Sequence, residues 1–582
     1  MSRSVKGAKR AKSFSSQGSL NAAVKSICDI MRRSNCAGAL QYVPELTWIL
    51  FLRILDEQEE LEAEKAAAVR GEFRPALVKP FRWRDWARPD GKKRQELEAA
   101  ATGAFFSFIN GELIPHLKKL KERPNATPRQ KVISEIMSGV DRTRIDTERN
   151  FKDVLDKVGE ISAFNVDPTH VFTLSQVYEG LLLKMGEKGN DGGQFFTPRE
   201  IIRTIVEVIN PQPGKTVYDP CCGTGGFLAQ AYEHIERKLQ ENNTATGLDY
   251  DLLRHRTFYG REKENLVYPI TLANLMLHGI DEPHIWHGNT LTKEAIYEGL
   301  FEQAPGKFDY IFTNPPFGGK EGAAAQRDFD YKTNATQILF LQLIINSLAP
   351  GGQCGLVIDE GSLFRVDQDA FVKTKRRLLD TCRLWAVVSL PANVFAGAGA
   401  AVKTSILFFK KGKPTDRIWY FDLADMKVGK KQPYTRERMR GLGFYDLIRT
   451  LGDSERSWTV DFAAKRKAAD AEAERLLKTA EPVKAQAVKL KVELSAEKKK
   501  SDPDEAKLRE MGEGLKKAER EVREIENKAQ VTRDAVYDLK AVNPNAKSTE
   551  DTRTPAELLD FIEAKGREVA EALARLREKA RA

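Results

Sequence analysis

A rigid tetrapeptide, Asn314-Pro315-Pro316-Phe317, ends the apolar run from Asp309 to Thr313. Its two prolines fix their φ angles and remove two backbone N–H donors, so carbonyl acceptors are presented in a nearly fixed geometry. The Asn314 side-chain carbonyl and the Pro315 main-chain carbonyl can accept both hydrogens of an amino group. This localises the nitrogen lone pair and stabilises positive charge that develops on the nitrogen. The string predicts chemistry on an exocyclic amine, although alone it is also compatible with an ordinary loop.

A glycine-rich turn lies upstream, where an apolar run ends at Asp219 and Gly223-Thr224-Gly225-Gly226-Phe227 leads into a helix expected from about Leu228. Glycines let the backbone approach a ligand closely, and the first amides of a helix are ready donors. The turn lacks the Gly-Lys-Ser/Thr ending of a phosphate-gripping P-loop. It therefore predicts a site for another nucleotide-like ligand, with a plain strand-to-helix turn as the alternative.

Both strings lie in a region where short apolar runs alternate with helical patterns. This alternation predicts a doubly wound α/β sheet of the Rossmann-like type, with its ligand site beyond the carboxyl ends of the strands. The expected strands are Thr216 to Tyr218, Ala245 to Leu248, Ile285 to Trp286, Tyr310 to Thr313, Gly355 to Ile358, Leu384 to Ser389 and Ser405 to Phe409.

The segments on either side of this region differ from it in composition. Residues 19–165 repeat apolar side chains at helical spacing, with a further helix expected at Val177 to Leu183. Beyond residue 461, heptad runs interrupted at Ser501-Asp502-Pro503 predict a helical hairpin or a broken coiled coil. The predicted organisation is a disordered basic tail (1–18), an α-helical domain (19–165), a catalytic domain (166–415), a connecting segment (416–460) and a C-terminal coiled-coil-like helical region (461–582).

Length and composition set outer bounds. A chain of 582 residues suggests roughly three or four domains. A net charge of +10 is compatible with a polyanionic partner, but favours nucleic acid only weakly. No apolar run is long enough to span a membrane, and the six scattered cysteines are typical of a reducing cytoplasm. The histidines lack convergent ligand spacing, so no metal site is predicted.

The order of these motifs resembles that of S-adenosylmethionine-dependent DNA adenine methyltransferases. The resemblance implies that the Asp219 turn binds S-adenosyl-L-methionine, that Glu262 accepts hydrogen bonds from its ribose, and that Asn289, where the family usually has Asp, contacts its adenine. It also makes Gln194-Phe195-Phe196-Thr197-Pro198-Arg199 a further cofactor motif, although Thr197 and Pro198 could simply begin a helix. An initial Asn and final Phe resemble adenine-N6 more than cytosine-N4 enzymes. Phe317 would stack on an adenine rotated out of double-stranded DNA.

More of the chain resembles the modification subunit of type I restriction-modification systems, from about Leu20 to Lys411. The segments that carry this likeness are Tyr178 to Leu182, the Gln194 segment, Asn274 to Ile280, Leu390 to Phe395 and Lys403 to Ser405. The resemblance implies three partners: a specificity subunit, a second modification subunit and, where DNA is cleaved, a nuclease-translocase restriction subunit. Only a short segment separates the last expected strand from the C-terminal helices, which supports base reading by a separate subunit.

Two other functions stay open at this stage. Protein-glutamine methyltransferases use a similar Asn-Pro-Pro motif, but typically end it with Tyr and lack a long helical tail. The second alternative is a non-catalytic DNA-binding scaffold with a vestigial methyltransferase fold, against which the intact Asn314, Asp219 and Glu262 argue.

Overall fold

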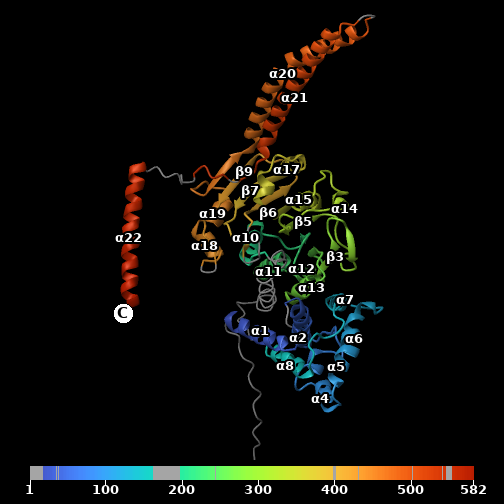
Figure 1. Cartoon of the computed structure of the whole chain (residues 1–582). Coiled ribbons are helices and arrows are strands. Elements are labelled where there is room, and N and C mark those ends of the chain that lie inside the picture. The colour runs from blue at the N-terminus through green and yellow to red at the C-terminus, as the bar shows by residue number, and fades with distance from the viewer. Residues whose placement is uncertain are drawn as a thin grey trace, which may run out of the picture.

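The computed structural model describes residues 17–34, 36, 39–161, 197–242, 244–396, 402–429, 432–500, 503–540, 542–545 and 554–581. Along the chain these residues form an N-terminal helical region, a ten-stranded mixed sheet flanked by helices, and a long helical hairpin (Figure 1). The predicted helix at Val177 to Leu183 and most of the predicted tail at 1–18 lie outside the described residues.

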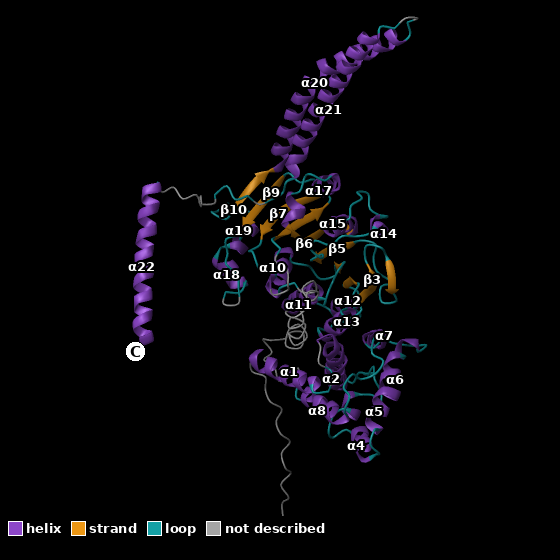
Figure 2. Cartoon of the chain, in the orientation of Figure 1, coloured by secondary structure: helices purple, strands orange, loops and turns teal. Residues whose placement is uncertain are grey.

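The sheet has the order β10-β9-β7-β8-β6-β5-β1-β2-β3-β4 (Figure 2). The central strand β1 (Val217–Asp219) pairs in parallel with β2 (Phe258–Glu262) on one side and with β5 (Phe308–Thr313) on the other. Strand order therefore reverses between β1 and β5, and a crevice opens beyond their carboxyl ends. The other strands are β3 (His284–Asn289), β4 (Glu294–Tyr297), β6 (Leu348–Asp359), β7 (Cys382–Ser389), β8 (Thr404–Lys411), β9 (Arg417–Asp422) and β10 (Ser457–Asp461).

Apolar clusters pack on both faces of the sheet because successive strand residues point to opposite sides. On β5, Tyr310 and Phe312 join the cluster that includes residues of α10 and α11, whereas Ile311 joins the cluster that includes residues of α15 and α17. The helices of this region are α10 (Arg199–Ile209), α11 (Gly226–Glu241), α12 (Gly247–His255), α13 (Tyr268–Leu277), α14 (Ala323–Gln326), α15 (Thr336–Ser347), α16 (Glu360–Phe364), α17 (Asp369–Thr381), α18 (Arg436–Gly441) and α19 (Phe444–Thr450).

The N-terminal helical region has its own aromatic core, in which Trp48 stacks on Trp86 with their ring centroids 6.4 Å apart. Its Arg129 donates to Glu62 within the region and, over 2.5 Å, to Asp281, which follows α13. This ion pair ties the region to the sheet domain. The helices are α1 (Gln17–Arg32), α2 (Ala39–Ala68), α3 (Trp83–Trp86), α4 (Lys92–Ala99), α5 (Ala104–Phe108), α6 (Ile114–Lys118), α7 (Pro128–Ile136) and α8 (Glu148–Gly159), with a π-helical segment η1 (Ile109–Leu113) and a short 3-10 helix η2 (Leu120–Glu122).

The C-terminal hairpin consists of α20 (Phe462–Lys498) and α21 (Glu505–Asp534), which lie side by side (Figure 1). Small side chains bring them together: Ala473, Ala480, Ala518 and Ala529 are buried along the contact. Pro482 lies inside α20 without ending it. The predicted hairpin is present, and a separate last helix, α22 (Pro555–Arg581), follows it. Across the described residues, no helix combines the length and apolarity needed to cross a membrane.

Two sequence predictions need correction. The strand expected at Ala245 to Leu248 is wrong: Thr246 and Asp249 form a capping box that starts α12, and β2 lies further on at Phe258–Glu262. The segment 416–460, expected to be a connector, contributes β9 and most of β10 to the sheet, because the apolar run Ile418 to Phe421 pairs in parallel with β7.

Candidate active site

The two motifs meet at the reversal point of the sheet. A cavity of about 230 Å³ opens there, lined by residues from the turn after β1 and from the loop after β5. Of the residues predicted from the sequence, it exposes Gly223, Glu262, Asn289, Asn314, Pro316 and Phe317. The strand order thus brings together the predicted cofactor site and the predicted amine site.

The glycine-rich turn is shaped by contacts that leave no space for larger side chains. Gly223 and Gly225 have positive φ angles of 53° and 79°. A Cβ at Gly226 would lie 2.9 Å from Ile202 Cδ1, so α11 packs closely on α10 and a larger residue would displace the end of the Ile202 side chain. Thr224 and Phe227 are buried, and Phe227 stacks on Phe312. Within the turn, Gly223 alone of the predicted contact residues from Gly223 to Phe227 lines the cavity.

Glu262, at the end of β2, lines the cavity together with two other carboxylates, Glu264 and Glu321. Its Oε2 accepts from Gly223 N over 2.9 Å, and its Oε1 accepts from Lys263 N and Glu264 N, both over 2.8 Å. Burial raises the pKa of Glu262 to about 7, although these N–H groups oppose the shift. Since a carboxylate offers about four acceptor positions and three are used, Glu262 can still accept from one ligand hydroxyl.

Asp219 is buried at the end of β1 and does not line the cavity. Its Oδ1 accepts from Thr313 Oγ1 over 2.7 Å and from Cys221 N over 3.1 Å. Burial raises the pKa of Asp219 to about 7, and the Thr313 hydroxyl partly offsets the rise. In this structure Asp219 joins the glycine-rich turn to the end of β5.

Asn289 lines the cavity at the end of β3, but its side-chain oxygen already accepts hydrogen bonds from the following loop. Oδ1 accepts from Leu291 N over 3.0 Å and from Thr292 N over 3.4 Å. The side chain therefore has its Nδ2 hydrogens to offer a ligand. A contact with adenine would be donated by Asn289 to a ring nitrogen.

Asn314 follows β5 directly and faces the cavity. Its Nδ2 donates to Thr197 Oγ1 over 3.1 Å, a contact between residues 117 positions apart. Its Oδ1 is buried and accepts no hydrogen bond from the residues that the structure describes. Leaving such an acceptor unsatisfied costs about 1–3 kcal/mol, so the site is built to receive a donor.

The segment upstream of α10 is only partly described. Gln194, Phe195 and Phe196 lie outside the described residues. Pro198 is the N-cap of α10 and Arg199 its first residue, so the helix begins one position later than expected. The Thr197 hydroxyl does not cap the helix and instead accepts from Asn314.

Family models and known proteins match most of the chain. The N-6 DNA Methylase family model matches residues 170–480, and the HsdM N-terminal domain model matches residues 20–158. The methylase subunit of the Escherichia coli type I restriction enzyme EcoEI is 35% identical over 409 residues, 69% of this chain and 77% of that protein. The chain belongs to the N-6 DNA methylase family. Within it, the chain is a modification subunit of the type I restriction-modification kind.

Solved structures extend the likeness beyond the sheet domain of this N-6 DNA methylase. A type I modification subunit from Vibrio vulnificus is 31% identical, with a TM-score of 0.66 over 78% of this chain and 94% of that chain. A chain from a study of type I restriction-modification complex assembly and conformational transition is 33% identical. It covers 97% of this chain and 98% of its own length, with a TM-score of 0.62.

Two aromatic side chains form one wall of the methylase cavity. Phe317 packs edge-to-face on Phe395, with ring centroids 5.4 Å apart. Phe395 is buried, whereas Phe317 is partly exposed and lines the cavity. Phe395 thus holds the face of Phe317 in place, a role that the sequence signals only as an aromatic within Leu390 to Phe395.

Gln337 is a residue of this methylase site that sequence reasoning missed. It lies near the start of α15 and is buried. Its Nε2 donates to the Pro315 carbonyl over 3.1 Å, and its Oε1 accepts from Asp359 N over 3.0 Å. The carbonyl predicted to hold an amine hydrogen is therefore already anchored by one side chain.

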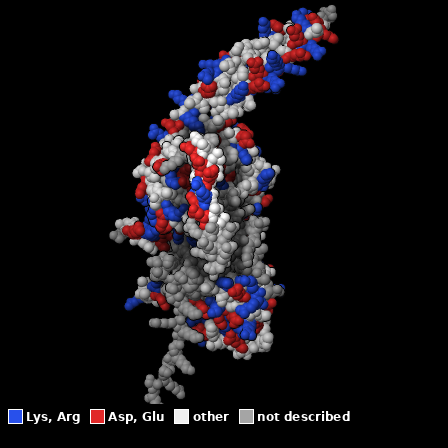
Figure 3. Space-filling view, turned by 60° about the vertical axis from the view of Figure 1, so that its left-hand side comes forward, with Lys and Arg blue, Asp and Glu red and all other residues white. Residues whose placement is uncertain are grey.

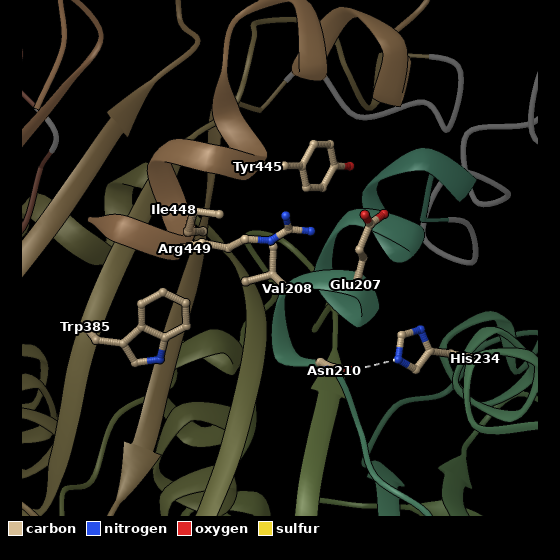
Figure 4. A pocket seen from close by; sticks show the side chains of 8 residues that line it. All are labelled: Glu207, Val208, Asn210, His234, Trp385, Tyr445, Ile448 and Arg449. Carbon is tan, nitrogen blue, oxygen red and sulfur yellow. Dashed lines mark hydrogen bonds between the residues drawn. The ribbon is translucent and has the colours of Figure 1, made fainter. Parts of the chain in front are cut away.

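A larger cavity of about 340 Å³ is lined by residues of α10, α11, β7 and α19 (Figure 4). It is lined by Glu207, Asn210, His234 and Trp385 among others. Its charged and ring groups already have partners in the protein: Glu207 pairs with Arg436, and a His234 ring nitrogen is 2.8 Å from Asn210 Oδ1.

The described part of the chain contains no group of three or more His, Cys, Asp or Glu residues placed to hold a metal ion.

Proposed function

We propose that this chain transfers a methyl group from S-adenosyl-L-methionine to the 6-amino group of adenine in double-stranded DNA, as the modification subunit of a type I complex. The observation that carries the proposal is the Asn314 Oδ1 acceptor. It is buried, it has no partner among the described residues, and it shares a cavity with Glu262 and Gly223.

The residues at the cavity fit S-adenosyl-L-methionine. Glu262 has one acceptor position left for a ribose hydroxyl, Gly223 allows a close approach of the ligand to the backbone, and Asn289 can donate to the adenine ring. When bound, the cofactor supplies a methyl group activated by a sulfonium. Asp219 supports this site indirectly, because its hydrogen bonds with Cys221 N and Thr313 Oγ1 fix the glycine-rich turn relative to β5.

The amine end of the cavity acts by electrostatic positioning. Asn314 Oδ1 and the free lone pair of the Pro315 carbonyl accept the two hydrogens of the target amino group, so its lone pair is directed at the methyl carbon. As the N–C bond forms and the C–S bond breaks, both acceptors stabilise the charge on nitrogen. One of the amine hydrogens then leaves as a proton to solvent. Phe317 stacks on the base, which must leave the duplex to reach this site.

The C-terminal helices are suited to partner proteins rather than to a DNA backbone. On α22, exposed apolar side chains include Leu559, Phe561, Ile562, Val569 and Leu573. On the face of the helical hairpin that Figure 3 shows, acidic and basic residues are interspersed. We propose that these helices contact a specificity subunit or a second modification subunit in the cytoplasm. A restriction subunit would join the same assembly where the system cleaves DNA.

The test is to express the chain with the specificity subunit of its own system and to map methylated adenines by single-molecule sequencing. Methylation should require both proteins and should disappear in Asn314→Ala, while that variant still assembles and binds the cofactor. Labelling of protein rather than DNA by the active complex would favour the glutamine methyltransferase. Failure of the wild-type complex to bind cofactor would favour the scaffold.

A further inference from the structure

The loop that follows β5 is fastened to the start of α15 at three points. Thr336 N donates to Gly319 O over 3.2 Å, and Lys320 forms an isolated β-bridge with Ala335. These two contacts hold the far end of the loop. The third point is Gln337, whose side chain reaches the Pro315 carbonyl.

We infer that Gln337 is a positioning residue for the methyl transfer, because it fixes the direction in which the Pro315 carbonyl presents its remaining lone pair. This inference rests on the proposed function, in which that carbonyl accepts one hydrogen of the target amine. Neither Gln337 nor Pro315 is among the residues that line the cavity, and Pro315 is buried between the lining residues Asn314 and Pro316. Gln337 therefore acts through the Pro315 carbonyl.

The orientation of the Gln337 amide is determined from both ends. Asp359 N is a backbone N–H and can only donate, so the atom facing it must be Oε1. The Pro315 carbonyl can only accept, so the atom facing it must be the NH2 group. A side chain held in this way has no second orientation with equal hydrogen bonding, and the carbonyl is fixed relative to the end of β6.

The consequence for the reaction is geometric. A carbonyl oxygen has two acceptor positions, and Gln337 occupies one of them. The other is left for the amine hydrogen that Asn314 does not take. Without the Gln337 donor, the peptide after Pro315 could tilt, and the two acceptors would no longer match the two hydrogens in the transition state.

Two substitutions separate the hydrogen bond from the volume of the side chain. Gln337→Met keeps a similar length but donates nothing. Gln337→Glu keeps the shape and the acceptor for Asp359 N, but an ionised carboxylate repels the Pro315 carbonyl. When that carboxyl group is protonated, it can donate to the carbonyl as the amide does.

A matched control lies on the same helix. Gln342 is fully buried in α15, and its amide holds a main-chain donor and acceptor of one residue, Tyr331, over 3.1 and 2.9 Å. Gln342→Glu and Gln342→Met therefore disturb an equivalent pair of hydrogen bonds at Tyr331, which is not among the residues that line the cavity. They report any general loss of packing in α15.

The experiment measures kcat, cofactor Kd and the pH profile of methylation, with the full chain in complex with its specificity subunit. For Gln337→Met we expect a kcat about 10- to 100-fold lower, with an unchanged Kd for S-adenosylmethionine and normal activity in both Gln342 variants. For Gln337→Glu, the deficit relative to wild type should grow as pH rises. Comparison at each pH cancels the titration of Asp219 and Glu262, which all the variants share.

Wild-type kcat in Gln337→Met would overturn the inference, and so would a Gln337→Glu deficit that equals that of Gln342→Glu at every pH. Either result in an active wild-type complex leaves the proposed function standing. Absence of DNA methylation by the wild-type complex would instead refute the proposed function itself.

Discussion

A substitution of Thr197 can separate two roles, cofactor binding as predicted from the sequence and orientation of Asn314 as indicated by the structure. The sequence places Thr197 in a cofactor motif, whereas in the structure its hydroxyl accepts the Asn314 Nδ2 hydrogen bond over 3.1 Å. Thr197→Val replaces that hydroxyl with a methyl group of nearly the same size. The substitution therefore removes the acceptor and leaves the volume of the side chain almost unchanged.

The expected size of the effect follows from burial. Asn314 Oδ1 is already without a partner among the described residues, and Thr197→Val deprives the other end of the amide as well. An unsatisfied buried donor costs about 1–3 kcal/mol. If that cost appears as misorientation of the amide in the transition state, kcat falls by about 5- to 150-fold.

The assay is single-turnover methylation of a DNA duplex by the complex, together with a binding titration of S-adenosylmethionine. Thr374→Val is the matched control, because the buried Thr374 hydroxyl donates to Ala370 O within α17. The reasoning predicts a reduced rate of methylation at unchanged cofactor Kd. A weaker cofactor Kd with an unchanged rate would refute it and would return Thr197 to the cofactor role predicted from the sequence.

Three further predictions concern the neighbouring residues. Burial raises the pKa of Glu262 to about 7, so the carboxylate becomes charged as pH rises from about 6 to 8. The ratio of wild-type to Glu262→Gln affinity for S-adenosylmethionine, measured by calorimetry, should therefore increase across this range. A ratio that does not change with pH would contradict a contact between Glu262 and the ribose. Thr313→Val removes the 2.7 Å hydrogen bond to Asp219 and should lower the free energy of unfolding, measured by denaturant titration, by about 1–3 kcal/mol. Thr292→Val is the control and should leave the free energy of unfolding unchanged, because the Thr292 hydroxyl lies at the surface. Phe317→Ala should raise KM for DNA and reduce the fluorescence of 2-aminopurine at the target position, while cofactor binding stays as in wild type.

The titration of Asp219 also affects stability. Its folded-state pKa of about 7 lies above the usual value of 3.8, because burial disfavours the charged form. The folded chain therefore holds a proton that the unfolded chain releases between these two values. This contribution to stability is complete below about pH 4 and is lost as pH rises through about 7. Asp219→Asn should flatten that part of a plot of unfolding free energy against pH.

The elements that carry the site could be predicted because their signals are local. β1 and β5 are short apolar runs that end at a glycine-rich turn and at a double proline, and each signal lies within ten residues of its strand. The strand at Ala245 to Leu248 was wrong because Thr246 and Asp249 cap a helix there. β9 was missed because its apolar residues lie beyond the last recognisable motif.

The supporting contacts could not be predicted in the same way, because they depend on which strands are neighbours. Gln337 is 22 residues from Pro315 and 22 from Asp359, and it joins them only because β5 and β6 are adjacent in the sheet. Thr197 is 117 residues from Asn314. No periodicity or local motif encodes such pairs. The sequence therefore predicts the acceptors, Asn314 and Pro315, but not the residues that orient them, Thr197 and Gln337.

In the proposed reaction, the two acceptors, Asn314 Oδ1 and the Pro315 carbonyl, are positioned by helices on opposite faces of the sheet. Asn314 is oriented by Thr197, two residues before α10, and α10 packs on one face of the sheet. Pro315 is oriented by Gln337 of α15, whose apolar residues pack on the other face. A shift of either helix would tilt one acceptor relative to the other, while the Asp219 to Thr313 bond kept the cofactor turn joined to β5. Methyl transfer should therefore be more sensitive than cofactor binding to changes in the packing of α10 or α15. A substitution that loosens the packing of α10 or α15 should lower kcat while the cofactor Kd stays near the wild-type value, and measuring both in the complex with the specificity subunit tests this.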